Sequence, residues 1–533
     1  MTTHGCFARV GRTGPAVARS KKSTRRLCGM SLVVLSTFIL MSCASVPKDY
    51  SRTESTAFQD YLDTDVGQLF EEAAREHPGE SGFAIIRYGR QAFTARIALV
   101  DLAEKSLDAQ YYIWEADATG RILAQHLIQA ADRGVRVRLL VDDINLAGRD
   151  QRVAAMDAHP NIEIRVFNPF ANRSARLFDF VTDLGRINHR MHNKTLVMDN
   201  AVAIVGGRNI GNHYFGVATD ANFRDLDIAA AGPVVRDISN VFDHFWNGDW
   251  SVPIAALVDE PYSEADLPGA REALRTGIAE APYPYPLDQD VGQLRAELAS
   301  IRDQFVWAHG QIVWDDPADI DEGIQEGSIN KALYKRMATL QRELLLESAY
   351  LIPRDRAIEA ARQLIDRGVR MRVLTNSLAS NDVVAAHAGY ANRRKGLIEV
   401  GVEVYEYRPD SRISKTRAWR GESKAALHTK AIVFDRESVF IGSFNLDPRS
   451  ADINTEAGLY VESPELAEQV AAYMDEGVEP QNSYRVLLDE HGDLYWVTEV
   501  DGAEVRYDKE PETTFGQRFK SGLFKLLPVE QHL

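Results

Sequence analysis

An internal duplication constrains the fold of this chain more than any other feature of its sequence. DRGVRVRLLVDD begins at Asp132 and returns as DRGVRMRVLTNS at Asp366, 234 residues later. MHNKTLVMDNAVAIVGGRN begins at Met191 and is answered by LHTKAIVFDRESVFIGSFN at Leu427, 236 residues later. Two separate blocks that share almost one spacing indicate that a whole domain has been duplicated.

Each copy predicts the same order of helices and strands. In the first copy, apolar residues at helical spacing predict helices at AFTARIALVDLAEK and GRILAQHLIQAADRG. Strand patterns occur at LDAQYYIW, VRVRLLVDD and IEIRVFNP. The second copy has the corresponding strands at LLLESAYLIP, VRMRVLTNS and VEVYEYRP, and a corresponding helix at AIEAARQLIDRG. Strands that alternate with helices predict an α/β fold with two similar domains, each a largely buried sheet flanked by helices.

The N-terminus has the pattern of an export signal. Seven basic residues and no acidic residue occur in residues 1–42, and they precede the apolar run SLVVLSTFILMS. The run ends in Leu40-Met41-Ser42-Cys43, which resembles the lipobox of bacterial lipoproteins. We therefore expect residues 1–42 to be a signal peptide and Cys43 to carry a lipid. The alternative is an ordinary membrane anchor.

This interpretation predicts a place in the cell envelope. A lipid on Cys43 would anchor the chain to a membrane of a bacterial cell, facing the periplasm, and Ala44 slightly favours the outer membrane because no aspartate follows the cysteine. The three cysteines all lie at or before residue 43, so the sequence predicts neither an internal disulfide nor thiol catalysis downstream.

Composition shifts divide the rest of the chain. We expect a linker at 43–74, a first domain at 75–252, a Pro- and acid-rich connector at 253–329 and a second domain at 330–480. A helix is predicted in the connector at VGQLRAELASIRDQF. Residues 481–533 predict a small three-stranded appendix and a C-terminal amphipathic helix in FGQRFKSGLFKLLPVEQHL. Two alternatives stay open for this helix, contact with a membrane or packing on its own domain.

The duplicated hairpins carry the residues that favour catalysis. Both contain His-x-Lys, followed five residues after the Lys by Asp, and further on Gly-x-x-Asn. The members are His192, Lys194, Asp199 and Asn209 in the first copy and His428, Lys430, Asp435 and Asn445 in the second. Residues two apart on a strand point to the same face, so each His and Lys share one spot. One such pair is typical of a solvent-exposed strand, but two at equivalent places indicate an active site.

These paired motifs resemble the signature of the phospholipase D superfamily, HxKxxxxD in two copies, over residues 75 to 485 or so. The resemblance implies two similar domains with mixed sheets, related by a pseudo-twofold axis, with one active site between them. It also implies that no metal and no other cofactor takes part. The sequence around the motifs agrees, because it contains no convincing cluster of metal ligands.

The residue types suit the cleavage of a phosphodiester. Neutral imidazole attacks an anionic phosphodiester without the repulsion that an anionic nucleophile meets. Following the resemblance, His192 is expected to be the nucleophile and His428 the general acid and base, although the pseudo-symmetry leaves the order open. Lys194 and Lys430 would neutralise the nonbridging oxygens, to which Asn209 and Asn445 would donate hydrogen bonds.

Further residues are expected to support this site. The resemblance implies that Asp199 and Asp435, grouped with the motif residues, are structural at the hairpin turns. It also implies a carboxylate that orients each histidine, for which the candidates are Asp225 and Glu456, with Asp227 as the alternative to Asp225. Ser443 is a further candidate for supporting the bound phosphate. Core packing and a role near the site both stay open for the following residues: Tyr111, Tyr112, Trp114, Tyr350 and His213.

Net charge and local sequence narrow the range of possible substrates. The net charge of −16 disfavours a nucleic acid as partner. GGRNIGNHYFG, QYYIW and the C-terminal LLPVE resemble bacterial cardiolipin synthases of the C type. That resemblance implies transfer of a phosphatidyl group to phosphatidylglycerol from a second phospholipid, for which phosphatidylethanolamine is one candidate, through a phosphohistidine. The alternative is a hydrolytic phospholipase D or another exported phosphodiesterase or nuclease. Whether a protein partner exists is left open by the sequence.

Overall fold

A computed structural model describes residues 45–281, 283–285, 291–323, 327–413 and 423–524. The chain divides into two compact units, Met1–Val46 and Pro47–Leu533. The second unit contains all the described helices and strands. The predicted signal peptide and Cys43 lie outside the described residues.

The first half of this unit is built on eight strands. Their spatial order is β9, β4, β3, β2, β5, β6, β8 and β1. β2, β3 and β4 run parallel, because α4 and α5 return the chain between them, and the remaining pairs are antiparallel. The bounds are β1 Ser81–Ile86, β2 Ser106–Tyr111, β3 Arg136–Asp142, β4 Ile162–Phe167, β5 Lys194–Met198, β6 Val202–Gly206, β8 Asp227–Ala231 and β9 Ser251–Pro253.

The second half repeats this arrangement. Its spatial order is β17, β16, β15, β11, β12 and β13, and the three parallel strands β11, β12 and β13 are again joined by helices. The bounds are β11 Glu343–Ser348, α13 Asp355–Asp366, β12 Arg370–Asn376, α14 Val384–Glu399, β13 Glu403–Tyr407, β15 Lys430–Phe434, β16 Ser438–Gly442, β17 Ala457–Glu462 and α17 Pro464–Gly477. The predicted duplicated α/β fold is confirmed.

One long strand joins the two sheets. β10 (Val306–Trp314) pairs with β1 through its first residues and with β17 through the rest, which gives a continuous 18-stranded mixed sheet. A buried apolar cluster draws on both halves, with Phe83 and Val205 from the first and Ile441 and Val461 from the second. The two halves therefore share a core, which fixes how their motifs face each other.

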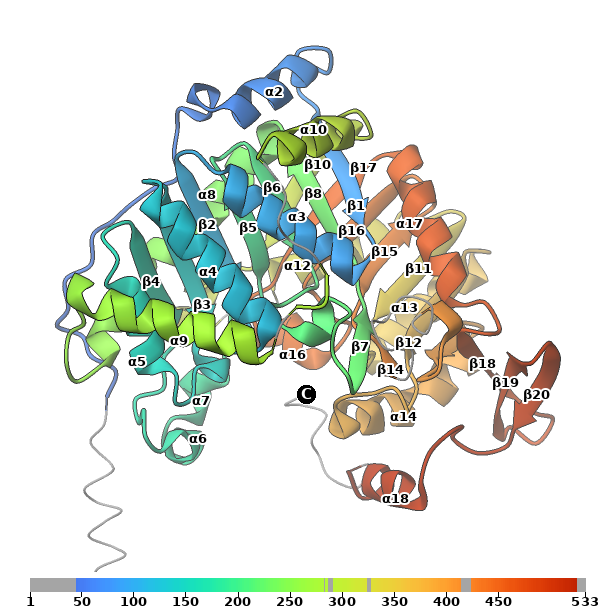
Figure 1. Ribbon diagram of the computed structural model, residues 1–533. Helices are drawn as coiled ribbons and strands as arrows, with labels where there is room; N and C mark the ends of the chain where they lie inside the picture. The colour runs from blue at the N-terminus through green and yellow to red at the C-terminus, as the bar shows by residue number, and fades with distance from the viewer. Residues whose placement is uncertain (1–44, 282, 286–290, 324–326, 414–422, 525–533) are drawn as a thin grey trace, which may run out of the picture. The chain divides into compact units, whose positions relative to one another are not determined.

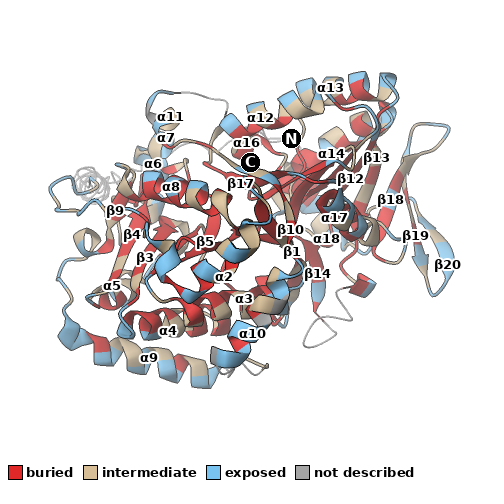
Figure 2. Ribbon diagram, turned by 90° about the horizontal axis from the view of Figure 1, so that it is seen from above, coloured by how far each residue is buried: buried red, intermediate tan, exposed pale blue. Residues whose placement is uncertain are grey.

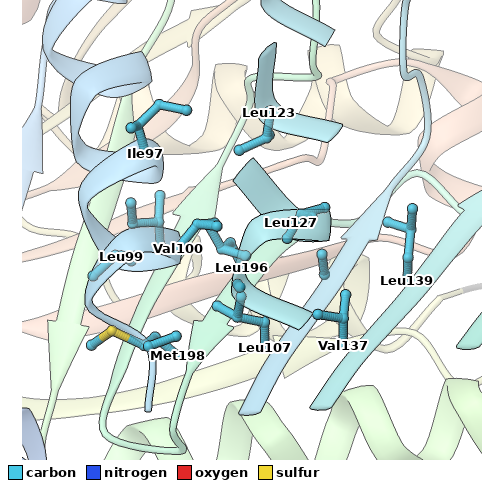
Figure 3. Packing of buried hydrophobic residues seen from close by; sticks show 14 of the residues in the cluster. Ile97, Leu99, Val100, Leu107, Leu123, Leu127, Val137, Leu139, Leu196 and Met198 are labelled. Atoms are coloured by element: carbon cyan, nitrogen blue, oxygen red, sulfur yellow. The ribbon is translucent and has the colours of Figure 1, made fainter. Parts of the chain in front are cut away.

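Helices cover the outer face of each sheet (Figure 1). α3 (Gly89–Leu102) and α4 (Ala118–Asp132) lie over β2, β3 and β5, where Leu123 and Leu127 of α4 pack towards Leu107 and Val137 (Figure 3). Most strand residues of the two halves are buried, and exposure concentrates on helix surfaces, loops and the C-terminal strands within residues 494–507 (Figure 2). The remaining helices of this half are α2 Asp65–Ala74, α5 Asp150–Asp157, α6 Asp179–Thr182, α7 Leu184–Ile187 and α8 Pro233–Asn247.

The connector is ordered in its described parts. The helix predicted there is α10 (Val291–Arg302), and α9 (Leu267–Glu280) precedes it. After β10 the connector continues with α11 (Ala318–Asp321), and α12 (Ser328–Met337) begins at its end and runs into the second domain.

The C-terminal strands extend the second sheet instead of forming a separate module. β18 (Ser483–Leu488) pairs with β13, and β19 (Leu494–Val500) and β20 (Ala503–Tyr507) follow in antiparallel order. α18 (Phe515–Phe524) then packs against α14. In the part of the chain that the structure describes, no helix combines the length and the apolar character needed to cross a bilayer.

Candidate active site

Each motif lies on a β-hairpin with the same tight turn. β5–β6 and β15–β16 are joined by turns whose two central residues have positive φ, namely Asp199 (52°) and Asn200 (53°) in one and Asp435 (51°) and Arg436 (55°) in the other. This is the type I′ geometry, whose twist matches that of antiparallel strands and which Asp and Asn tolerate better than most residues.

The two motif aspartates bind backbone groups at these turns. Asp199 Oδ1 accepts hydrogen bonds from the backbone N–H of Lys105 (2.8 Å) and Ser106 (2.7 Å), and Oδ2 accepts one from Glu104 (2.9 Å). Asp435 repeats the pattern with the N–H groups of residues 341, 342 and 343. Seven residues of extended chain, roughly 20 Å, separate each aspartate from its histidine. This geometry favours a structural role for both carboxylates.

We expect Asp199→Ala to destabilise the fold by about 2–4 kcal/mol. The change removes a buried acceptor from three backbone donors and puts alanine at a positive φ. Urea unfolding monitored by circular dichroism would measure the loss. Asp199→Asn is the matched control, because it keeps an acceptor and a residue that tolerates this φ. If Asp199→Ala unfolds at the same urea concentration as the parent protein, the structural role is wrong.

The segment that immediately precedes each histidine pairs with the opposite half of the chain. Met191 forms a parallel bridge with Thr455, and the backbone N–H of His192 donates to the carbonyl of Thr455 at 2.8 Å. In the other half, β14 (Lys424–Leu427) pairs in parallel with β7 (Ala221–Arg224), and the N–H of His428 donates to the carbonyl of Arg224 at 2.7 Å. The two halves are therefore interleaved at the motifs.

This interleaving gives each histidine a carboxylate from the other half. His192 Nδ1 lies 2.8 Å from Glu456 Oε2, and His428 Nδ1 lies 2.6 Å from Asp225 Oδ2. The alternative partner, Asp227, instead forms ion pairs with Arg96 at 2.9 Å and Arg208 at 3.2 Å. A carboxylate on Nδ1 fixes the ring and leaves Nε2 for chemistry. Both motifs thus contribute to one site between the halves.

Each carboxylate has its own support. Ser443 Oγ donates to Glu456 Oε2, and the backbone N–H of Glu456 donates to Asp315 Oδ2 at 3.2 Å. Asp225 Oδ1 accepts from the N–H of Leu226 at 2.8 Å. At the position equivalent to Ser443 the first half has Gly207, where a Cβ would lie 2.3 Å from Asp225 Oδ1. The structure therefore places Ser443 behind a carboxylate, where it holds Glu456.

Both lysines are buried beside their histidines. Lys194 Nζ donates to the carbonyl of His192 and Lys430 Nζ to that of His428, and each lysine is about 1% exposed. Burial lowers the pKa of Lys430, and lowers that of Lys194 well below the ordinary value, although nearby carboxylates oppose the change. An anionic phosphate between the lysines would restore their charge.

The two histidines have different electrostatic surroundings. Burial and the positive charges of Lys194 and Lys430 hold the pKa of His192 well below 6.5. Burial and Lys430 also lower the pKa of His428, but Asp225 opposes this shift. Burial raises the pKa of Glu456 to about 8. For Asp225, burial acts to raise the pKa, but His428 and Lys430 lower it overall. Asp225 is thus ionised and opposes the loss of a proton from His428, whereas the neutral form of His192 is favoured more strongly.

Aromatic rings line both sides of the site. Tyr112 lies edge-on to His192, with ring centroids 4.8 Å apart. Tyr214 and Phe223 each have a ring centroid 5.1 Å from that of His428. Tyr214 lies within GGRNIGNHYFG, which served only for the family resemblance, and Phe223 lies two residues before Asp225; neither was predicted as a site residue. One signal could have found Phe223, because β7, which carries it, ends beside Asp225.

The remaining aromatic candidates lie outside contact with the histidines. Tyr111 is core packing, with its hydroxyl 3.1 Å from Arg96 Nε. Trp114 donates to the carbonyl of Gly120 and packs on Tyr111. Tyr350 donates to Asp382 at 3.0 Å, and His213 Nδ1 lies 2.8 Å from the carbonyl of Ala221.

The two motif asparagines are not equivalent. Asn209 is engaged by the protein, since its Oδ1 accepts from the N–H of Ile113 at 3.0 Å and its Nδ2 donates to the Tyr214 hydroxyl at 2.9 Å. Asn445 Oδ1 is buried and has no hydrogen-bond partner among the described residues. A bound phosphate can only accept from an amide, through Nδ2–H, and no described residue accepts from Asn445 Nδ2, whereas Asn209 Nδ2 is engaged by Tyr214. Asn445 is therefore the better candidate for contact with a bound phosphate. In the same described ranges no group of three or more His, Cys, Asp or Glu side chains is placed to hold a metal ion.

Comparison with known proteins identifies the family. Residues 97–246 and 333–477 match the family described as cardiolipin synthase, PLD-like domain. The chain belongs to this family. Cardiolipin synthase C of Escherichia coli (strain K12) is 38% identical over 465 residues, which cover 85% of this chain and 97% of that protein. An uncharacterised protein of Helicobacter pylori (strain ATCC 700392 / 26695) is 31% identical, covering 94% of this chain and 99% of that protein. The resemblance predicted from the paired motifs is confirmed.

A solved structure shares the fold of this cardiolipin synthase-like chain. The phosphatidylserine synthase of Haemophilus influenzae Rd KW20 matches with a TM-score of 0.56, covering 87% of this chain and 100% of that chain. Its sequence is 15% identical, so the likeness concerns the fold alone.

Proposed function

We propose that the protein is a phosphatidyltransferase that forms cardiolipin from phosphatidylglycerol and a second phospholipid. The single observation that carries this proposal is the crossed pairing of two histidines with carboxylates from opposite halves, which supports one phosphodiester site. The relationship to a cardiolipin synthase over most of the chain supports phospholipid as the substrate class. Hydrolysis is the less favoured alternative.

In the first step, His192 acts as the nucleophile. Its Nδ1–H donates to Glu456 Oε2, which also accepts from Ser443, so the lone pair of Nε2 is free to attack phosphorus. The phosphorus–oxygen bond to the leaving alcohol breaks while the new phosphorus–nitrogen bond forms. Lys194 and Lys430 stabilise the charge on the nonbridging oxygens, and Asn445 donates to one of them.

His428 supplies the proton that the leaving alkoxide needs. Ionised Asp225 stabilises its imidazolium, and the negative charge of a bound phosphodiester favours that form further. In the second step, His428 takes a proton from the hydroxyl of phosphatidylglycerol, which attacks the phosphohistidine and releases His192. The same residue thus serves as acid and then as base. Exchange of the two histidine roles remains the alternative that a trapped phosphohistidine would decide.

The lipid products test this function directly. Purified protein would be given phosphatidylglycerol in vesicles, with and without phosphatidylethanolamine, and the lipids would be analysed by mass spectrometry. Cardiolipin is the expected product, and a higher yield with phosphatidylethanolamine would identify it as donor. Phosphatidic acid as the sole new lipid would overturn the transferase in favour of hydrolysis. In a separate assay, cleavage of added DNA would favour a nuclease. Phosphatidic acid and cardiolipin differ in mass by hundreds of daltons, so the outcomes are distinct.

We also propose that the protein works at a membrane of the bacterial cell envelope. The support is the sequence alone, namely the export signal in residues 1–42 and the lipobox-like cysteine, Cys43. Radiolabelled palmitate incorporated into the parent protein, and not into Cys43→Ser, would support lipid anchoring. The domain boundaries at residues 75, 253, 330 and 481 are a separate proposal, in which the segment after residue 481 continues the second sheet through the pairing of β18 with β13.

The acid limb of the pH–rate profile is expected to have its midpoint below pH 6.5. Protonation of His192 removes the nucleophile, and its pKa is lowered by burial and by the cations that face it. Its partner Glu456, whose pKa burial raises to about 8, is largely protonated below that pH and adds little negative charge to oppose this shift. The neutral form therefore persists to lower pH than in free imidazole. Measurement of kcat/KM between pH 4.5 and 8 would check this. An acid limb centred above pH 6.5 would contradict the assigned surroundings of His192.

A further inference from the structure

Large apolar side chains are exposed in two groups of the described chain. The first group, here called the lip patch, lies on the short helices around α6 and α7 and consists of Leu177 (82% exposed), Phe180 (41%), Val181 (80%) and Leu184 (46%). The second, the helix patch, consists of Phe515 (77%), Phe519 (63%) and Leu523 (54%) on α18. Exposed apolar groups of this kind mark interaction sites.

The lip patch stands on a fixed base. Arg173 and Arg176 form ion pairs with Asp143, which is fully buried, and the Phe180 ring packs on Phe170 with centroids 5.6 Å apart. Asn168 Nδ2 donates to the backbone carbonyls of Arg186 and His189, which flank the end of α7. The apolar side chains are therefore held towards solvent by an ordered, charge-paired support.

The lip patch also borders the active site. α7 ends at Ile187, five residues before His192. Between them, Asn188 accepts from Arg449 Nη1 at 2.9 Å, and His189 Nδ1 lies 2.7 Å from the carbonyl of Ile453. Both contacts reach the second half beside Glu456. The patch is thus rigidly coupled to the edge of the site.

The helix patch forms one stripe along α18. Its three residues are spaced by four, so they share one helix face, and the rings of Phe515 and Phe519 stack at 6.3 Å. The opposite side of the helix packs on α14, which begins two residues after Asp382, the partner of Tyr350. Lys520, beside the stripe, is exposed. This is the pattern of a helix that lies in a membrane interface.

Both patches lie on the side of the unit that carries the active site. In Figure 1, α6, α7 and α18 project from the lower side, on which β7, β14 and α16 (Pro448–Asp452) also lie. β14 leads directly into His428, and α7 leads to His192. α2 and α10 lie at the opposite, upper side.

We propose that the lip patch and the helix patch together dock the protein on a phospholipid bilayer, with their apolar side chains inserted and the active site facing the headgroups. This proposal rests on the proposed function, because the phosphorus that His192 would attack is tethered to acyl chains inside the bilayer. The net charge of −16 argues against attraction to anionic lipids as the main force. Burial of the apolar side chains supplies it instead.

The test compares one reaction on two forms of the substrate. The full chain and its Leu177→Asp/Val181→Asp and Phe515→Asp/Phe519→Asp variants would be assayed on phosphatidylglycerol vesicles and on short-chain phosphatidylglycerol below its micelle concentration. We expect each double variant to lose at least tenfold activity on vesicles and less than twofold on the monomeric lipid. Ile301→Asp is the matched control, because Ile301 is a similarly exposed apolar residue (38%) on α10. The activity of this variant should be unchanged on vesicles and on the monomeric lipid.

A second readout locates the insertion independently of turnover. Tryptophan at position 177 (Leu177→Trp) should add emission that vesicles of brominated phosphatidylcholine quench, at low salt and in 1 M NaCl alike, whereas Ile301→Trp should add emission that is not quenched. Equal loss on both substrates, or no quenching at position 177, would overturn the docking surface. So would a dimer of the parent protein that the double variants dissociate, since a second copy would then cover the patches. If the parent protein makes cardiolipin neither from vesicles nor from the monomeric lipid, the proposed function fails instead.

Discussion

Replacement of His192 with alanine is expected to reduce phosphatidyl transfer by at least about 10⁴-fold while the protein remains folded. In the proposed mechanism this imidazole forms the covalent intermediate, while His428, whose Nδ1 lies 2.6 Å from Asp225, acts as acid and base. Activity on phosphatidylglycerol vesicles, measured with unfolding by urea, separates chemistry from stability. A modest loss of tenfold or less would rule out His192 as the nucleophile.

His428→Ala is the matched variant, because it decides the order of the two roles. If His192 is the nucleophile, His428→Ala retains a site for attack and accumulates phosphohistidine with a substrate whose leaving group needs no proton, such as a p-nitrophenyl phosphodiester. His192→Ala should accumulate none. The reverse result would exchange the roles, as the pseudo-symmetry of the site permits.

Replacement of Asp225 with asparagine is expected to reduce activity by roughly 10²–10⁴-fold, the range seen when a histidine loses the carboxylate that orients it. The amide is nearly the same size as the carboxylate but neutral, so it neither stabilises the imidazolium nor fixes the Nδ1–H tautomer of His428. The kcat of the variant should fall with a smaller change in KM. A p-nitrophenyl leaving group should recover much of the loss, since it needs no acid.

Gly207→Ala provides an independent probe of the same contact. The added Cβ would lie 2.3 Å from Asp225 Oδ1, so the carboxylate must shift from the position in which it contacts His428. We expect the same defect as in Asp225→Asn, namely loss of the proton transfer by His428 to the leaving group. Asp227→Asn is the control for carboxylate loss nearby, and its effect should appear in stability because Asp227 pairs with Arg96 and Arg208. Loss of catalysis in Asp227→Asn without loss of stability would reverse the assignment.

Much of the fold was determined by information that is local in the sequence. The spacing of apolar residues predicts α4 and β3 within a residue or two, and the return of the same pattern from Asp366 predicts α13, β12 and the second sheet. Asp at a hairpin turn, followed by a residue that also accepts positive φ, is likewise local chemistry. The pairing of His192 with Lys194 follows from strand alternation alone.

The contacts between the halves depended on tertiary structure. No local pattern shows that β10 pairs with both β1 and β17, or that β18 joins β13 instead of standing apart. The family resemblance suggested Asp225 and Glu456, but the sequence left Asp227 open because both aspartates lie in one short stretch. Only the pairing of β14 with β7 brings Asp225 to His428, while Asp227 lies on β8 beside the buried Arg96.

The sequence by itself thus determined the duplicated α/β architecture, the two motifs and the chemistry they suit, because periodicity and residue type are properties of neighbours along the chain. The tertiary structure decided which carboxylate faces which histidine, that Ser443 supports Glu456, that Tyr214 and Phe223 line the site, and where apolar side chains remain exposed. The pairing of each histidine with its carboxylate joins residues more than 200 positions apart, and it is fixed only when the shared core brings the halves together.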